Sequence, residues 1–239
     1  MSRKWIRIGL ALSLFLLSAG CYDNQPLKES AIVMGTGIDK DEEKEGYVIS
    51  VEILKIGAVQ ENTTGSGGDT GNKRSVVLRI RAENPFVGVR NLIRYTKRRL
   101  IFTHNRVWII SEKAARDNIL KPFDTIMRDQ MLRLNSFLFV SEDNPEEVLT
   151  TTTLLESLVS LELFVGMEAI RFLGGSTTEI YMKDLFEMLS GPVKAGFVPM
   201  IELADETEGK ITKIHGVALV KGEKMIGKLT HEETLGLLW

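Results

Sequence analysis

The first 21 residues constrain this chain most, because they decide the compartment in which the rest of it folds. Three of the first seven residues are basic, and 8–17 (IGLALSLFLL) is an apolar run of about ten residues. Small residues at 18–20 then precede Cys21. A basic start, a short apolar core and small residues at the cleavage position are typical of a secretory signal. A transmembrane helix needs roughly 20 apolar residues, so we expect 1–20 to be a cleaved signal peptide instead.

Cys21 is the only cysteine of the chain. The sequence Leu17-Ser18-Ala19-Gly20-Cys21 resembles the lipobox of bacterial lipoproteins, in which the cysteine receives a diacylglyceryl group and becomes the new amino terminus. Each buried CH₂ adds about 0.8 kcal/mol, so acyl chains hold a protein firmly on a bilayer. The alternative is an ordinary cleaved signal with an incidental cysteine. We expect lipid attachment at Cys21, with palmitate and diacylglycerol on an exported, membrane-anchored protein.

Composition excludes little beyond nucleic-acid binding. Apolar residues make up 44% and charged residues 26% of the chain, as in ordinary globular proteins. The net charge is −2, so no global basic field favours nucleic acid. One cysteine forms no intramolecular disulfide, so the stability of the fold must come from its core.

The first half of the chain predicts strands before helices. Residues 31–38 and 47–53 are expected to pair as an antiparallel hairpin across the charged turn at 39–46, and 74–83 resumes the strand alternation. Asn84-Pro85 is a typical helix start. The helix is expected to run to about residue 99 and to bury Phe86, Val89, Ile93 and Leu100.

Two continuously apolar segments, 107–110 and 137–140, predict buried strands. Short helices are expected at 111–120 and 123–132, separated by Pro122. The order of strand, helix and buried strand indicates a crossover unit.

The second half is richer in helix. We expect helix from Asn144 to Leu173, broken near the threonines at 150–153, and a further helix at 180–189 behind a capping box at 176–179. Pro199 divides the segment 196–203, which predicts an edge strand.

The last part of the chain predicts a hairpin of 211–220 and 225–229. A second capping box, Thr230 to Glu233, then begins a terminal helix.

The pattern as a whole predicts an α+β fold with mixed sheets packed against helices. We expect two regions plus the start of a further domain. The expected boundaries are the signal at 1–20, an α+β domain at 22–143, a helix-rich region at 144–205, and at 206–239 the hairpin and helix of a truncated carboxyl-terminal domain.

The chain contains partial matches to nucleotide-binding, calcium-binding and zinc-binding motifs, but none has the required residues at the required spacing. Gly35-Thr36-Gly37 lacks a third glycine and a following helix, so a strand is favoured over a nucleotide loop. Asp39, Asp41 and Glu43 lack the glycine and glutamate that a calcium loop needs at its sixth and twelfth positions. The three histidines are far apart and fit no zinc motif. We therefore expect no enzymatic activity, no cofactor, no metal site and no catalytic residue.

Two surfaces are candidates for contacts with partners. Arg90, Arg94 and Arg98, joined by Lys97, are expected to form one stripe on the first long helix, as a solvated face or as a docking surface for anionic lipid or an acidic partner. The segment 154–173 has a wide apolar arc, for which we weigh burial between domains against a subunit-docking groove.

Several motifs in this order resemble the C-subunit lipoproteins of bacterial spore germinant receptors (Ger(x)C or GerAC-like). They are Cys21-Tyr22-Asp23, Ala31-Ile32-Val33 with Gly35-x-Gly37-Ile38-Asp39, Phe102-Thr103-His104-Asn105-Arg106-Val107, Ile109-Ile110-Ser111-Glu112, Arg128-Asp129, Gly216-Val217-Ala218-Leu219-Val220-Lys221, Lys224, Gly227-Lys228-Leu229 and Glu233-Thr234-x-Gly236-Leu237-Leu238. The family usually has tryptophan where this chain has Tyr22, and its members continue well beyond Trp239.

The resemblance implies a lipoprotein on the outer face of the spore inner membrane. It implies a complex with two integral membrane subunits, A and B, that recognise nutrients, and no enzymatic activity. The favoured function is therefore a receptor subunit that acts in germination signalling through protein and membrane contacts. The alternative is a lipoprotein that binds a small molecule, either a germinant or another solute, and a deep, polar-lined cleft between the two regions would favour it.

Overall fold

The computed structural model describes residue 5 and residues 30–55, 74–127, 134–173, 179–207 and 209–238. The expected signal peptide, Cys21 and Arg128-Asp129 lie outside this part of the chain. Within it, no helix has both the length and the apolar character needed to cross a membrane.

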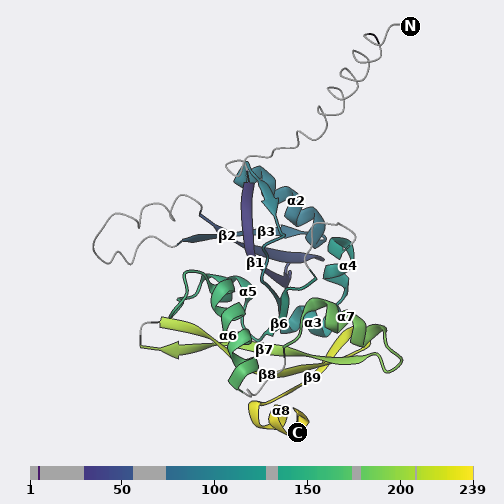
Figure 1. The fold of residues 1–239 in the computed structure, drawn as a ribbon. Helices are drawn as coiled ribbons and strands as arrows, with labels where there is room; N and C mark the ends of the chain where they lie inside the picture. The colour runs from purple at the N-terminus through teal and green to yellow at the C-terminus, as the bar shows by residue number, and fades with distance from the viewer. Residues whose placement is uncertain are drawn as a thin grey trace.

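The strands of the described residues form one mixed sheet of nine strands rather than separate sheets (Figure 1). Its order is β3-β2-β1-β5-β6-β7-β8-β9, and β4 pairs in parallel with the start of β1. The strands are β1 (Ser30–Lys40), β2 (Tyr47–Leu54), β3 (Ser75–Ala82), β4 (Arg99–Ile101), β5 (Val107–Ser111), β6 (Phe137–Ser141), β7 (Ala195–Glu206), β8 (Gly209–Lys221) and β9 (Lys224–Leu229).

The first three strands confirm the expected antiparallel hairpin and its extension. A bulge in β1 shifts the register between Val33 and Gly35, so Val33 and Ile38 point into the same core although five positions separate them. An extra residue in one strand reverses which face the following side chains meet. Gly35 and Gly37 consequently face the opposite side of the sheet.

The centre of the sheet is parallel, since β1, β5, β6 and β7 run in the same direction. Every residue of β5 and of β6 is buried, which confirms the prediction of two strands covered on both faces. Trp108 of β5 stacks on Phe102 and meets Phe123 edge to face.

Helices cover both faces of this sheet, each over its own hydrophobic core (Figure 1). The first face carries α2 (Pro85–Thr96), α3 (Glu112–Asn118), α4 (Lys121–Met127) and α7 (Met182–Ser190). The second face carries α5 (Pro145–Thr150) and α6 (Val159–Leu173). The terminal α8 (His231–Leu238) lies against β8 and β9, and its predicted capping box is present. The Thr230 N–H donates to the Glu233 carboxylate, and the backbone N–H of Glu233 donates to Thr230 Oγ1.

The first long helix differs in two ways from its prediction. The helix α2 ends at Thr96, where Lys97 turns into the left-handed region at φ 52°. Its buried positions are Pro85, Gly88 and Leu92, whereas Ile93 is 44% exposed. The predicted apolar face of the helix is therefore one position out of phase at Ile93, where Leu92 is buried instead. The helix also ends about one turn earlier than expected.

The prediction of an edge strand at Pro199 was wrong. The strand β7 lies between β6 and β8, but its pairing with β6 begins only at Met200. The register with β8 also shifts between Pro199 and Met200. Proline is tolerated at such a bulge because no regular ladder hydrogen bond is lost there. The expected hairpin of β8 and β9 is confirmed, and it continues the same sheet.

The position of Pro122 also differs from its prediction, since it lies in the first turn of α4 rather than between two helices.

The helix α7 begins at Met182, where Asp184 accepts a hydrogen bond from Tyr181 N–H at 2.9 Å. The expected capping residues 176–178 lie outside the described residues.

These observations confirm the α+β fold class. The boundary expected at residue 143 lies between strands of the one sheet, and the boundary expected at residue 205 falls inside β7. The division into domains stays a prediction.

Candidate functional site

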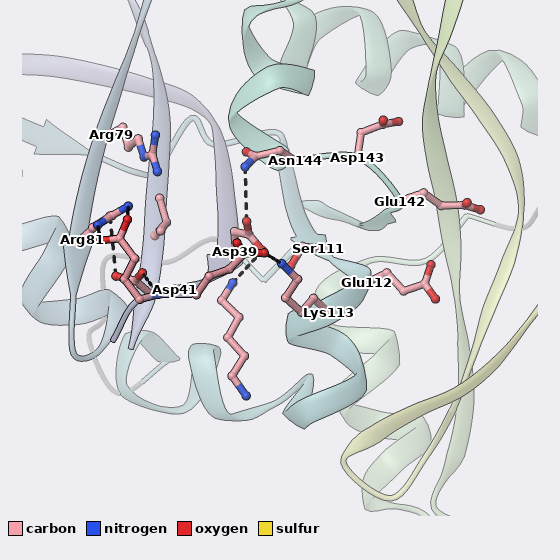
Figure 2. Close-up of a pocket in the computed structure, with 14 residues that line it drawn as sticks. Asp39, Asp41, Arg79, Arg81, Ser111, Glu112, Lys113, Glu142, Asp143 and Asn144 are labelled. Carbon is pink, nitrogen blue, oxygen red and sulfur yellow. Dashed lines mark hydrogen bonds and ion pairs between the residues drawn. The ribbon is translucent and has the colours of Figure 1, made fainter. Parts of the chain in front are cut away.

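The carboxyl ends of the parallel strands border a polar cavity of about 340 Å³ (Figure 2). Ligands of open α/β sheets bind at this edge, outside the point where the strand order reverses. Here that point lies between β1 and β5, because the chain leaves β1 toward β2 and β3 and returns on the other side. The lining residues are Asp39, Lys40, Asp41, Glu42, Glu43, Val48, Arg79, Arg81, Ser111, Glu112, Lys113, Glu142, Asp143 and Asn144.

Carboxylates outnumber basic groups in this lining, and each basic group already has an acidic partner. Arg81 bonds Glu43 and lies 3.7 Å from the buried Asp41, and Lys113 bonds Glu42. The bond from Arg81 lowers the pKa of Glu43, and the bond to Glu42 raises the pKa of Lys113. These pairs tie the β1–β2 turn to β3 and α3.

The other two basic residues of the lining are held in the same way. Arg79 pairs with Glu146 at 3.1 Å and Lys40 with Asp117 at 2.8 Å. Since every cation among the described lining residues is engaged, these residues offer no free positive charge to an anionic ligand.

Two glutamates on the other side of the cavity are directed toward β8 and β9 (Figure 2). Lys228 of β9 lies 2.9 Å from Glu142 and 3.6 Å from Glu112, and the hydrogen bond to Glu142 is the main reason why the pKa of Lys228 is raised. His215 lies 3.4 Å from the same Glu142. The glutamates thus connect the closing hairpin to the central strands.

The uncharged polar groups and Asp39 are used in local structure. Ser111 Oγ accepts from Ala114 N–H as the N-cap of α3, and the side-chain oxygen Oδ1 of Asn144 accepts from Glu146 N–H as the N-cap of α5. The Asn144 amide also donates to Asp39 at 3.4 Å. The cavity therefore brings together no nucleophile with a general base, and in the described part of the chain no cluster of His, Cys, Asp and Glu has the arrangement of a metal site.

A wider hollow of about 650 Å³ lies on the other side of Lys40. It is also bordered by Tyr47, whose pKa is raised by burial and by the charge of Asp117. The hollow is lined by Lys40, Glu45, Gly46, Tyr47, Glu83, Asn84, Asp117 and Lys121.

The structure separates the three arginines that the sequence placed on one stripe. Arg90 and Arg94 lie exposed on α2, where Arg90 covers the ring of Phe86 at 5.3 Å. Arg98 lies beyond the end of the helix, in the turn before β4, and is also exposed.

The Gly35-Thr36-Gly37 motif lies within β1, as the prediction of a strand required. A Cβ atom on Gly35 would come within 2.8 Å of the Ser160 Cβ, and one on Gly37 within 2.7 Å of the Pro145 Cβ. The glycines let α5 and the start of α6 pack closely on the sheet.

The apolar arc of 154–173 is covered only in part. Leu163 and Met167 are buried, but Leu154 and Leu155 are 61% and 93% exposed. These two leucines are held in place because the Glu162 carboxylate accepts the N–H groups of both, at 2.7 and 3.1 Å. Burial among the described residues therefore does not account for the whole arc.

Sequence reasoning missed Glu52, which is fully buried in β2. Its carboxylate accepts from Val159 N–H at 3.2 Å, Ser160 N–H at 3.0 Å and the Ser75 hydroxyl at 3.0 Å. Glu52 thereby caps the start of α6 from another element, where a negative charge offsets the helix dipole.

Asn105, in the motif from Phe102 to Val107, is also buried and structural. It accepts from the Thr36 hydroxyl and donates to the Val107 carbonyl, both at 3.1 Å, while its own carbonyl accepts from Ser136 at 2.6 Å. It joins β1, β5 and the start of β6 at the edge opposite the cavity.

Comparison with known proteins assigns this architecture to a family. Residues 23–203 match the family described as "Spore germination protein N-terminal domain". The chain belongs to this family. The match contains the bulged β1, the parallel centre of the sheet and the helices on both of its faces.

Two relatives from Bacillus subtilis (strain 168) are named for spore germination. The chain is similar to "Putative spore germination protein YfkR", with 28% identity over 236 residues that cover 95% of this chain and 58% of the relative. It is also similar to "Spore germination protein KC", with 25% identity over 213 residues that cover 87% of this chain and 52% of the relative. The chain thus spans little more than half the length of these relatives, and neither name states an enzymatic activity. No solved structure matches the chain.

Proposed function

We propose that this spore germination family member is the membrane-anchored lipoprotein subunit of a nutrient-germinant receptor. In this proposal Cys21 carries the lipid, and the folded part lies on the outer face of the spore inner membrane beside two integral membrane subunits, A and B. The observation that carries the proposal is the family match, which begins at residue 23, two positions after the only cysteine.

The geometry supports a role in contacts rather than in catalysis. The polar groups of the cavity are engaged with one another, so the site lacks a poised reactive pair. The exposed Leu154 and Leu155, held by Glu162, supply a preorganised apolar surface for a protein partner. A subunit that transmits a signal requires such surfaces and no chemistry of its own.

The anchor is tested on the full-length gene product in spores. Mass spectrometry of the mature amino terminus is expected to show a diacylglyceryl-modified Cys21, and the protein is expected in the membrane fraction. Cys21→Ala should release the protein from that fraction and slow nutrient germination, because acyl chains supply most of the attachment. Ser18→Ala keeps a small residue before the cysteine and should leave the modification intact. An unmodified thiol on a freely soluble native product would refute the proposal.

A second candidate function, small-molecule binding, is favoured by one observation. The cavity at the carboxyl edge joins residues of the expected first region to Asn144, the first residue of the expected second region, and its surplus of carboxylates suits a cationic ligand.

Thermal unfolding with candidate amines distinguishes the two functions. A ligand at 100 times its dissociation constant stabilises the folded state by about 2.7 kcal/mol. The receptor-subunit proposal predicts no such rise in Tm for this chain alone. A dose-dependent rise that Asp39→Asn abolishes, and that the distant, exposed Asp205→Asn retains, would favour binding instead.

A further inference from the structure

The turn after α2 places basic side chains beside the beginning of the folded domain. Arg94 lies in the last helical turn, and Lys97 and Arg98 follow in the turn that leads to β4. The strand β4 pairs in parallel with the start of β1, where Arg99 is the partner of Ser30. We name Arg94, Lys97 and Arg98 the basic corner.

The basic corner differs from the cationic groups that line the charged cavity. Arg79, Arg81 and Lys113 each have a carboxylate partner. In the part of the chain that the structure describes, no carboxylate pairs with any member of the basic corner, and all three are exposed. The corner therefore presents positive charge that nothing within the described fold neutralises.

Apolar and aromatic surface accompanies this charge. Ile93 is 44% and Tyr95 69% exposed, on either side of Arg94. Basic residues with an adjacent tyrosine are typical of surfaces at the interface between a membrane and water.

The helix dipole explains only part of the arrangement. A cation in the last turn of a helix is favourable, which accounts for Arg94 and for the C-cap residue Lys97. Arg98 lies outside the helix, and the exposed Tyr95 contributes nothing to the dipole. A purely structural explanation therefore leaves two of these features without a cause.

We propose that the basic corner docks on the anionic phospholipid headgroups of the membrane that holds the anchor. Eight residues separate Cys21 from Ser30, so the start of β1 stays within about 30 Å of an anchored Cys21. Basic residues close to an anionic membrane are attracted to it, and an anchor combined with a basic patch is the two-signal attachment that holds stably. The inference depends on the proposed function only for the presence of the anchor.

This docking fixes the orientation of the domain relative to the membrane. The charged cavity lies at the other end of β1, which has 11 residues and a length of roughly 35 Å. With the basic corner on the bilayer, the cavity and the carboxyl edge of the sheet face away from it.

The test uses the chain from residue 21 with Cys21→Ser, so that no lipid contributes. Sedimentation with vesicles is expected to show binding to phosphatidylcholine containing phosphatidylglycerol, little binding to phosphatidylcholine alone, and a loss of binding at high salt. Combining Arg94→Glu, Lys97→Glu and Arg98→Glu should weaken the binding at least about tenfold. The matched control reverses three exposed lysines elsewhere, Lys210→Glu, Lys221→Glu and Lys224→Glu, and should retain most of it. Circular dichroism establishes that both variants fold.

Absence of binding by the unlipidated chain at low salt would overturn the proposal, as would equal losses in the two triple variants. Unchanged vesicle binding with impaired receptor assembly would assign the corner to an acidic protein surface and would equally overturn it. Because lipidation is measured separately by mass spectrometry, a failure of the anchor and a failure of the basic corner give different results.

Discussion

Glu52→Ala is expected to lower the free energy of unfolding by about 3–5 kcal/mol, because its removal leaves buried hydrogen-bond donors without an acceptor. The Glu52 side chain is fully buried and accepts three hydrogen bonds, two of them from Val159 and Ser160 at the start of α6. Alanine would leave the two buried N–H groups and the half-buried Ser75 hydroxyl without this acceptor, and each buried donor left unsatisfied costs about 1–3 kcal/mol.

Urea unfolding and thermal melts measure this effect. For a chain of this size the loss corresponds to a fall in Tm of roughly 10 °C. Glu52→Gln keeps an acceptor oxygen of the same shape and should fall between wild type and Glu52→Ala. The control is Glu45→Ala, in the exposed turn that precedes the same strand. Faster amide exchange at Val159 and Ser160 should accompany the loss of stability, and a Glu52→Ala variant that melts like the control would contradict the capping role.

The position of Glu52 in a strand was predictable, but its partners were not. The alternation of Tyr47, Ile49, Val51 and Ile53 placed it on the opposite face of β2, and the structure confirms that the four apolar residues share one core. A strand pattern gives the side of the sheet but not what covers it. The covering helix begins at Val159, 107 residues later, so only the folded topology shows that this polar position is buried.

The same limit explains the errors in the central and closing strands. The apolar runs of β5 and β6 were sufficient to predict buried strands, because parallel strands covered on both faces have no polar side. Pro199 was assigned to an edge from its missing N–H alone. The bulge that accommodates it depends on where β6 stops pairing, which is a property of the neighbouring strand.

The candidate site was predictable only as separate pieces. Asp39, Asp41 and Glu43 were assigned to the charged turn at 39–46, and Asn144 to the start of a helix. The helix start is confirmed, with Asn144 as its N-cap, but Asp41 is buried and paired with Arg81. The carboxyl edge collects residues from four separate segments, and no local spacing contains that information. The prediction that Arg90, Arg94 and Arg98 form one stripe likewise assumed a continuous helix, whereas the left-handed Lys97 ends α2 before Arg98.

Gly35→Ala and Gly37→Ala are each expected to destabilise the fold by about 1–3 kcal/mol, the usual cost of overpacking a well-filled core. The added Cβ would lie 2.8 Å from the Ser160 Cβ in the first variant and 2.7 Å from the Pro145 Cβ in the second. Neither neighbour is the end of a flexible side chain, so α5 and α6 would have to move away from β1. The double variant should lose about 3 kcal/mol or more, with partial non-additivity because the sites share Leu149 as a neighbour.

The control for these variants is Gly227→Ala in β9, where an added Cβ meets nothing within 4 Å and stability should hardly change.

The two largest predictions are also coupled, because the backbone N–H of Ser160, the residue that faces Gly35, donates to Glu52. Displacing α6 in Gly35→Ala should already weaken that hydrogen bond, so Glu52→Ala should cost less in this background than in the wild type, by at least about 0.5 kcal/mol. Strict additivity in this double-mutant cycle, or a Gly35→Ala variant as stable as Gly227→Ala, would show that α6 does not rest on the glycine face of β1.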